Sequence, residues 1–199
     1  MTTITSLFLR LVLALTLATG AGAAMAVPAS YHISVDTGSL SGTGYLDLAF
    51  TGLDGTTASA IVTNFTGNAS GASILTGNAS GDLATTATLM GGTNYTWIDQ
   101  LVQFGGVFGL DVMFDFANTG AGNTFTMQFF NQDFSAYLGV QGPFATIELI
   151  PGTGTSFTTA GGIATVTETI TAAVPEPGQW LLMLTGLLLL AATARRRNM

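Results

Sequence analysis

Leu110-Asp111-Val112-Met113-Phe114-Asp115-Phe116 alternates along its whole length between two kinds of side chain. Successive side chains of a β-strand point to opposite faces, so its Leu, Val and Phe residues would form one apolar face. Asp111, Met113 and Asp115 would then face the other way. A period of two with β-branched and aromatic residues is typical of a half-buried strand, and the stretch predicts one.

The same period recurs along the middle of the chain, and Gly- and Asn-rich breaks separate the copies. The apolar stripes are Tyr31-x-Ile33-x-Val35, Leu46-x-Leu48-x-Phe50, Phe125-x-Met127-x-Phe129, Ile147-x-Leu149 and Ala164-x-Val166-x-Glu168-x-Ile170. No window between the two ends of the chain has a convincing helical spacing. Roughly eight to ten short strands predict an all-β single domain, an antiparallel β-sandwich or jelly roll, over residues 27–173.

A hexapeptide occurs twice, as Thr66-Gly67-Asn68-Ala69-Ser70-Gly71 and again from Thr76 to Gly81. A Gly-Asn pair is typical of a tight turn, so the repeat predicts two successive strand connections. Two copies are too few for a solenoid. The chain has no cysteine, so no disulfide supports the domain and its core must hold it together alone.

The charges are distributed very unevenly. All four basic residues lie near the ends, at Arg10 and Arg195 to Arg197, so residues 27–173 contain no lysine or arginine. The same span carries ten acids, the eleven of the chain less Glu176. Such a domain repels nucleic acid and anionic membranes, because both need cationic contacts. With one histidine, no cysteine and no Asp-x-Asp-x-Asp-Gly stretch, we predict no metal site and no other cofactor.

The N-terminus has the pattern of an export signal. Arg10 precedes an apolar core from Leu11 to Ala18, and Ala24-Met25-Ala26 has the small-x-small form of a cleavage site. We therefore expect residues 1–26 to be a signal peptide, a helix read by the Sec export machinery and removed before Val27. Ala21-Gly22-Ala23 offers a second cutting site.

Residues 174–199 combine a proline turn, an apolar run and a basic stop. Val174-Pro175-Glu176-Pro177 comes first, the run from Trp180 to Ala194 follows, and Arg195-Arg196-Arg197 nearly ends the chain. As a transmembrane helix the run spans roughly 22 Å at about 1.5 Å per residue, short of the ~30 Å hydrocarbon core. It is therefore a marginal permanent anchor, whose end the arginines hold in the cytoplasm.

This tail resembles the PEP-CTERM sorting signal of Gram-negative bacteria. The resemblance implies an exosortase as partner, a multi-pass membrane enzyme that recognises the tail. It also implies transient residence in the inner membrane, then delivery to the cell surface or biofilm matrix of an exopolysaccharide-producing cell. A permanent single-pass anchor is the alternative. The segment from Tyr31 to Phe50 is similar to a group of PEP-CTERM proteins of undefined activity. Because that activity is undefined, the similarity identifies no catalytic residues in this chain.

Catalytic motifs are missing from the sequence. It has no Gly-x-Ser-x-Gly elbow, no His-Glu-x-x-His and only one histidine, His32. Asp111 and Asp115 would lie near 13 Å apart along one strand at about 3.3 Å per residue, too far for a glycosidase pair. We therefore predict no enzymatic activity. Two acids from different strands, within about 10 Å in a cleft, would instead favour a carboxylate-dependent glycoside hydrolase.

Four aromatic residues form the candidate ligand site: Tyr95, Trp97, Phe104 and Phe108 cluster in a Gly-rich segment. Rings exposed on a sandwich stack on sugars, whereas buried rings fill the core, and the sequence leaves both alternatives open. Thr165, Thr167, Thr169 and Thr171 would line one face of the last strand, but one row is not an ice-binding array. The whole pattern predicts an exported, non-enzymatic surface or matrix protein, with a carbohydrate-binding module as the alternative.

Replacing Pro175-Glu176-Pro177 with three alanines tests the sorting signal. In a host that encodes an exosortase, we expect the wild-type chain to lose Trp180 to Met199, and the variant precursor to accumulate in the inner membrane. The reason is that alanines let the helix continue upstream and bury the turn. Intact mass of the protein from membrane and medium measures both. A wild-type protein that keeps its full C-terminus at its final location contradicts the prediction.

Overall fold

The computed structural model describes residues 29–52, 58–92, 95–116, 120–169 and 185–186. The predicted signal peptide with Ala24, Ala26 and Val27, the turn at Val174 to Pro177 and the arginines at 195–197 lie outside these ranges. Within them, no helix is long and apolar enough to cross a membrane.

The described part of residues 27–173 is all-β, as the alternation predicts. Its strands are β1 (Ala29–Asp36), β2 (Thr43–Gly52), β3 (Ala58–Thr66), β4 (Ile74–Thr76), β5 (Ala79–Asp82), β6 (Thr86–Met90), β7 (Thr96–Gln103), β8 (Val107–Phe116), β9 (Asn123–Phe130), β10 (Ala145–Ile150), β11 (Gly154–Thr159) and β12 (Ala164–Thr169).

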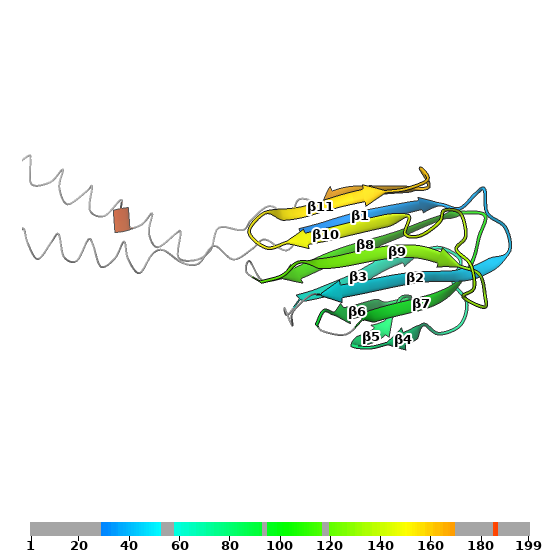
Figure 1. Ribbon diagram of the computed structural model, residues 1–199, viewed down its shortest axis with the longest axis horizontal. Coiled ribbons are helices and arrows are strands. Elements are labelled where there is room, and N and C mark those ends of the chain that lie inside the picture. The colour runs from blue at the N-terminus through cyan, green and yellow to red at the C-terminus, as the bar shows by residue number, and fades with distance from the viewer. Residues whose placement is uncertain (1–28, 53–57, 93–94, 117–119, 170–184, 187–199) are drawn as a thin grey trace, which may run out of the picture. The chain divides into compact units, whose positions relative to one another are not determined.

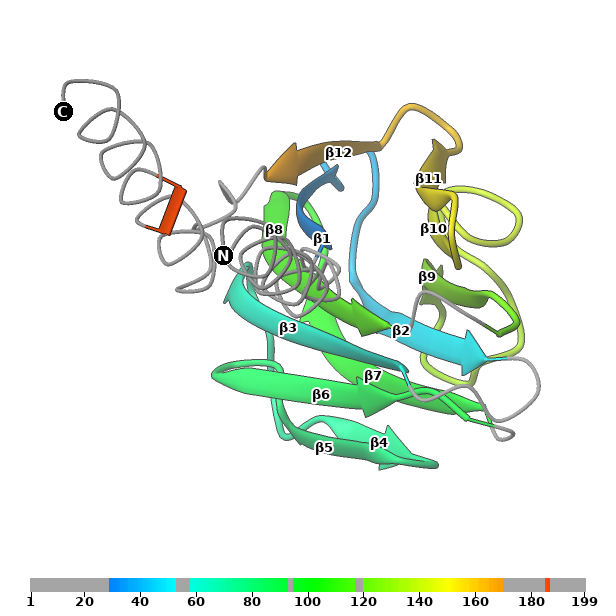
Figure 2. The ribbon, with the colours of Figure 1, turned by 90° about the vertical axis from the view of Figure 1, so that its left-hand side faces the viewer.

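The strands form two antiparallel sheets packed face to face as a β-sandwich (Figures 1 and 2). Sheet A has the order β12-β1-β8-β3-β6-β5, and sheet B has the order β11-β10-β9-β2-β7-β4. The first and last strands pair with each other, with Ser30 opposite Thr169. In sheet B, β2 lies between β7 and β9, so residues far apart in sequence share its outer face.

The predicted apolar stripes build the core between the sheets. The alternation of β8 is confirmed, because Leu110, Val112 and Phe114 are buried whereas Met113 and Asp115 are exposed. Phe114 is the centre of an aromatic cluster. Its ring centroid lies 6.1 Å from that of Tyr31, 6.1 Å from that of Phe50 and 5.5 Å from that of Phe125. These rings come from both sheets, so their contacts hold the sheets together.

The hexapeptide repeat does connect successive strands. The first copy begins at the last residue of β3 and the second at the last residue of β4. In the second copy Gly77 has a φ of 70°, a left-handed conformation that glycine adopts without a steric penalty. The short strands β4 and β5 flank this turn and extend the two sheets, so the described residues contain more strands than predicted.

Two neighbouring residues of β8 provide a test of the core. Phe114→Ala removes a fully buried ring and should lower the free energy of unfolding by about 3–5 kcal/mol. Met113→Ala, at a side chain that is 39% exposed, should change it by less than about 1 kcal/mol. Urea unfolding of the full-length chain in mild detergent measures both. Equal losses for the two variants would show that this alternation does not define the core.

Candidate functional site

The outer face of sheet B contains a groove of about 420 Å³. Its lining comes from β2, β7 and β9 and from the loop after β9: Asp47, Ala49, Thr51, Tyr95, Trp97, Asp99, Thr126, Gln128, Phe130 and Phe134. The strand register explains the hollow, because Trp97 faces Ala49 and Ala49 faces Thr126 across neighbouring strands. Two small side chains beside a large ring leave space above the sheet. We call this hollow the sheet B groove.

Two carboxylates lie side by side in the groove. Asp47 of β2 is directly opposite Asp99 of β7, and Gln128 of β9 is opposite Asp47 on the other side. Gln128 Nε2 donates a hydrogen bond of 2.8 Å to Asp47 Oδ1. Asp47 is 6% exposed and Asp99 is 5% exposed, so both acids are buried among their neighbours. Asp99 Oδ1 has no hydrogen-bond partner among the described residues.

Burial and proximity disfavour double ionisation of this pair below about pH 7. Burial, together with the hydrogen bond and the charge of Asp47, raises the pKa of Asp99 to about 7. The indole of Trp97, which donates to Asp99, acts in the opposite direction. Burial also raises the pKa of Asp47, although the hydrogen bond from Gln128 offsets part of that rise. The pair can therefore share one proton, as closely spaced carboxyl groups do.

Aromatic rings form the walls of the groove. Tyr95, just before β7, is 72% exposed, and Phe134, in the loop after β9, is also exposed. Phe134 stacks on Tyr45 with ring centroids 4.5 Å apart and contacts Phe130 at 5.7 Å. Phe130 in turn stacks on Tyr137 at 4.8 Å. This ring cluster holds Phe134 in place at the groove.

The four predicted stacking residues do not form one site. Tyr95 and Trp97 line the groove, as a ligand-stacking role requires. Phe104 and Phe108 are buried in the core, where both pack against Phe129. The ring centroid of Phe104 lies 5.1 Å from that of Phe129, and the centroid of Phe108 lies 6.1 Å from it. Their side chains are therefore not available for stacking. Sequence reasoning missed Asp47 and Asp99, although the outward stripes Tyr45-x-Asp47 and Tyr95-x-Trp97-x-Asp99 place each acid beside aromatic residues.

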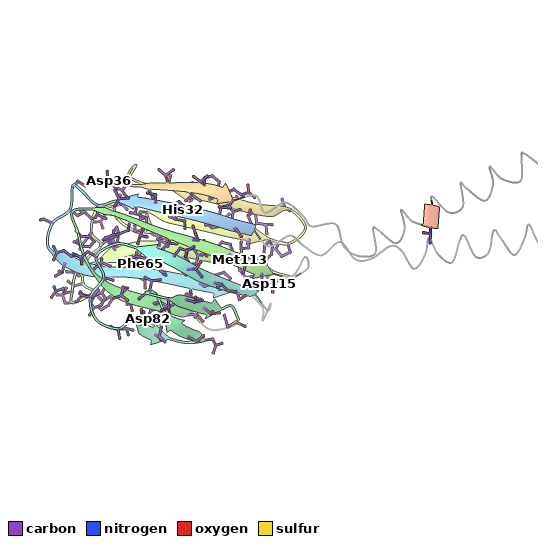
Figure 3. The ribbon with its side chains drawn as sticks, turned by 180° about the vertical axis from the view of Figure 1, so that it is seen from behind. His32, Asp36, Phe65, Asp82, Met113 and Asp115 are labelled. Carbon is purple, nitrogen blue, oxygen red and sulfur yellow. The ribbon has the colours of Figure 1, made fainter. Side chains whose placement is uncertain are left out.

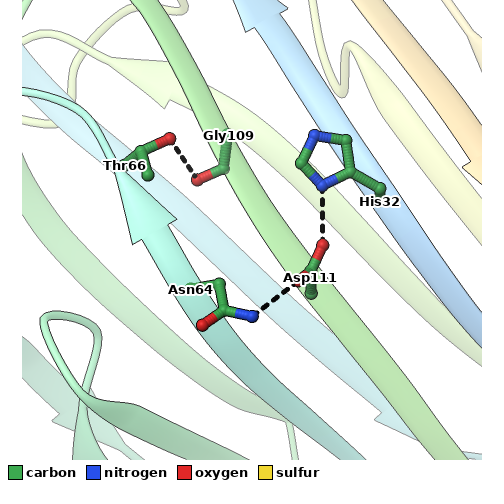
Figure 4. Close-up of polar contacts among 5 residues, drawn as sticks. All are labelled: His32, Asn64, Thr66, Gly109 and Asp111. Atoms are coloured by element: carbon green, nitrogen blue, oxygen red, sulfur yellow. Dashed lines mark hydrogen bonds and ion pairs between the residues drawn. The ribbon is translucent and has the colours of Figure 1, made fainter.

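A second polar arrangement lies on the outer face of sheet A, the face seen in Figure 3. His32 of β1 contacts Asp111 Oδ1 through Nδ1 at 2.6 Å, and Asn64 of β3 donates from Nδ2 to Asp111 Oδ2 at 2.7 Å (Figure 4). These bonds, that of Asn64 foremost, hold the pKa of Asp111 below its usual range. The His32 side chain is 51% exposed and belongs to this cross-strand contact.

A bulge in β3 places Asn64 for this contact. The pairing of β3 with β8 shifts between Thr63 and Thr66, and Asn64 there has a φ of 54°. Thr66 Oγ1 donates to the Gly109 carbonyl at 3.3 Å (Figure 4). A Cβ on Gly109 would lie 2.8 Å from Thr66 Oγ1, so glycine permits this approach. Among the described residues, no three His, Cys, Asp or Glu side chains gather as a metal site. The arrangement thus ties three strands together.

No protein-family model matches the chain, and a search of curated proteins and of solved structures also found no match. The sheet B groove therefore has to be interpreted from its own chemistry.

The Asp47–Asp99 pair predicts a pH dependence of stability. Aspartate in an unfolded chain titrates near pH 3.9, so between about pH 4 and 7 the folded protein binds more protons than the unfolded one. Stability should therefore fall as pH rises through this window, by at most about 1.4 kcal/mol per pH unit for one proton. In Asp99→Asn the decline should be much weaker, because asparagine does not titrate.

Urea midpoints of the full-length chain from pH 4 to 8 measure this dependence. Asp115→Asn, which removes an exposed acid of β8, is the matched control and should follow the wild-type curve. A decline of the same size in Asp99→Asn would show that the pair does not cause it.

Proposed function

We propose that this chain is an exported surface or matrix protein whose sheet B groove binds carbohydrate. The observation that carries the proposal is a groove with exposed aromatic walls and buried polar groups on one sheet face. Sugars present apolar C–H faces and hydroxyl edges, so their sites combine ring surfaces with a few fixed polar groups. A volume of about 420 Å³ lies within the usual range for small-ligand sites, ≈ 300–1,000 Å³.

The export and sorting signals support the location that this function needs. A chain with a signal peptide and a PEP-CTERM-like tail would reach the outside of the cell, where exopolysaccharide is found. Its span of 147 residues without lysine or arginine, from 27 to 173, limits nonspecific adhesion to nucleic acid and anionic lipid. The proposal thus assigns sorting to the two ends and binding to the domain between them.

Asp47 and Asp99 are two acids from different strands in one groove, the arrangement expected of the hydrolase alternative, but their spacing fits neither glycosidase geometry. Retaining glycosidases separate their two carboxyl groups by ≈ 5–5.5 Å and inverting ones by ≈ 6.5–9.5 Å, so that a sugar or a water fits between them. Asp47 and Asp99 are close enough to hydrogen-bond to each other. A sugar carbon therefore has no room between them, and we favour a polar floor that holds a ligand.

Tyr95→Ala and Trp97→Ala test the binding function. The full-length chain, in mild detergent, is applied to an array of neutral, acidic and amino-sugar oligosaccharides. We expect binding to at least one class, weakened about five-fold in each variant, because one lost ring contact is worth about 1 kcal/mol. Phe157→Ala, at an exposed ring of β11 outside the groove lining, should bind like the wild type. If the wild-type chain binds no oligosaccharide, the proposal is wrong.

A further inference from the structure

The sheet B groove has a strongly acidic floor with no basic side chain to balance it. Its lining contains two carboxylates and no histidine, lysine or arginine. Residues 27–173 have no lysine or arginine at all, and the one histidine, His32, lies on the outer face of sheet A. Buried carboxylates are normally paired with a cation or neutralised. In this groove, the compensating group has to be a proton or a ligand.

Asp99 also carries an unsatisfied acceptor. Its Oδ1 is buried with no hydrogen-bond partner among the described residues, and the residue lines the groove. A buried acceptor left unsatisfied destabilises the fold, and more so when it is charged. Carboxylates accept hydrogen bonds and donate none when ionised, so a complementary ligand group must be a donor.

The walls of the groove favour the same kind of group. The faces of aromatic rings are electronegative, and cations bind over Trp and Tyr rings in particular. Trp97 lies on the same strand face as Asp99, two residues away, and Tyr95 precedes it on that face. Phe130 and Phe134 stand on the other side of the groove. Aromatic walls above an acidic floor resemble the cages that bind organic ammonium groups.

We propose that the sheet B groove binds an amino sugar with a free ammonium group, within a polysaccharide whose hexosamines are not acetylated. The ammonium group lies at Asp47 and Asp99 and compensates their charge, while the sugar ring stacks on Trp97. An ammonium group carries three donors and no acceptor, which matches the floor. This inference rests on the proposed carbohydrate-binding function and specifies its ligand.

Acetylation of the sugar nitrogen provides the test. Isothermal titration calorimetry of the full-length chain in mild detergent, at pH 7, compares oligomers of glucosamine, N-acetylglucosamine and glucose of equal length, and trilysine. We expect the glucosamine oligomer to bind at least ten-fold tighter than the other three. Added salt should weaken this preference, because the recognition is ionic.

Two double variants separate the site from the overall charge. Asp47→Asn with Asp99→Asn should bring the glucosamine and glucose oligomers to within about two-fold of each other. Asp115→Asn with Glu168→Gln removes two exposed acids from strands of sheet A and should keep the preference. Thermal unfolding of each variant checks that it is folded, and Asp99→Asn alone serves if the first double variant is not.

The outcomes distinguish the two proposals. Equal or tighter binding of a neutral or acetylated oligomer leaves the carbohydrate-binding function intact and overturns the ammonium inference. Binding of none of the three sugars overturns the ammonium inference, and binding of no oligosaccharide on the array overturns both. Trilysine binding as tightly as the glucosamine oligomer overturns the amino-sugar assignment, as does loss of the preference in the sheet A double variant.

Discussion

The aromatic contact between the two sheets is the interaction on which this structure depends. The chain has no cysteine, and residues 27–173 have no lysine or arginine, so neither disulfides nor the usual salt bridges hold the sheets together. Phe114 of sheet A packs against Phe50 and Phe125 of sheet B. In a second ring cluster, Phe108 of sheet A packs against Phe129 of sheet B, which also contacts Phe144. At the edge, the Tyr31 hydroxyl hydrogen-bonds with Thr155, which links β1 to β11 across the sheets. Burial of rings thus provides the cohesion that charge cannot provide in this chain.

The outer faces are free to differ because the core between the sheets holds the two sheets together. On sheet A, His32, Asn64 and Asp111 satisfy one another across three strands and leave the carboxylate partnered on both oxygens. On sheet B, Asp47 and Asp99 are buried with one oxygen unpartnered. The first arrangement is complete as it stands. The second leaves a buried acceptor unsatisfied, so it is the better candidate for a function.

Local sequence predicted the fold wherever a strand keeps a clean apolar stripe. This holds for β1, β2, β8, β9 and β10, and for the start of β12. The stripe of β7 was missed because its buried face alternates Thr96, Ile98, Gln100 and Val102. Gln100 is tolerated there because its amide donates to the Ser70 carbonyl at 3.0 Å and accepts from Ser73 at 2.8 Å, both far away in sequence.

The candidate site was harder to predict for the same reason. Nothing local specifies that Asp47 meets Asp99, since β2 and β7 are separated by four other strands and pair only through the register of the whole sheet. The aromatic cluster of Tyr95, Trp97, Phe104 and Phe108 is divided by the turn after β7, which sends the last two rings into the core. Side-chain periodicity predicts which residues share one face of a strand. A site built from two strands also depends on which strands pair and in which register.

The pairing of β1 with β12 determines how the domain would carry mechanical force. Thr169, at the end of β12, lies beside Ser30 near the start of β1, so the chain enters and leaves the sandwich at one end. Suppose that force is applied to the chain after Thr169 and is resisted by a ligand held in the sheet B groove. This force then acts along the axis of β12. Antiparallel hydrogen bonds run perpendicular to the strands, so the β1–β12 bonds are then loaded together, in shear. Force applied to both chain ends would instead break the same hydrogen bonds one after another, starting at the Ser30–Thr169 end of the pair. A domain tethered through its C-terminal side therefore loads its edge strand in the more resistant of the two directions.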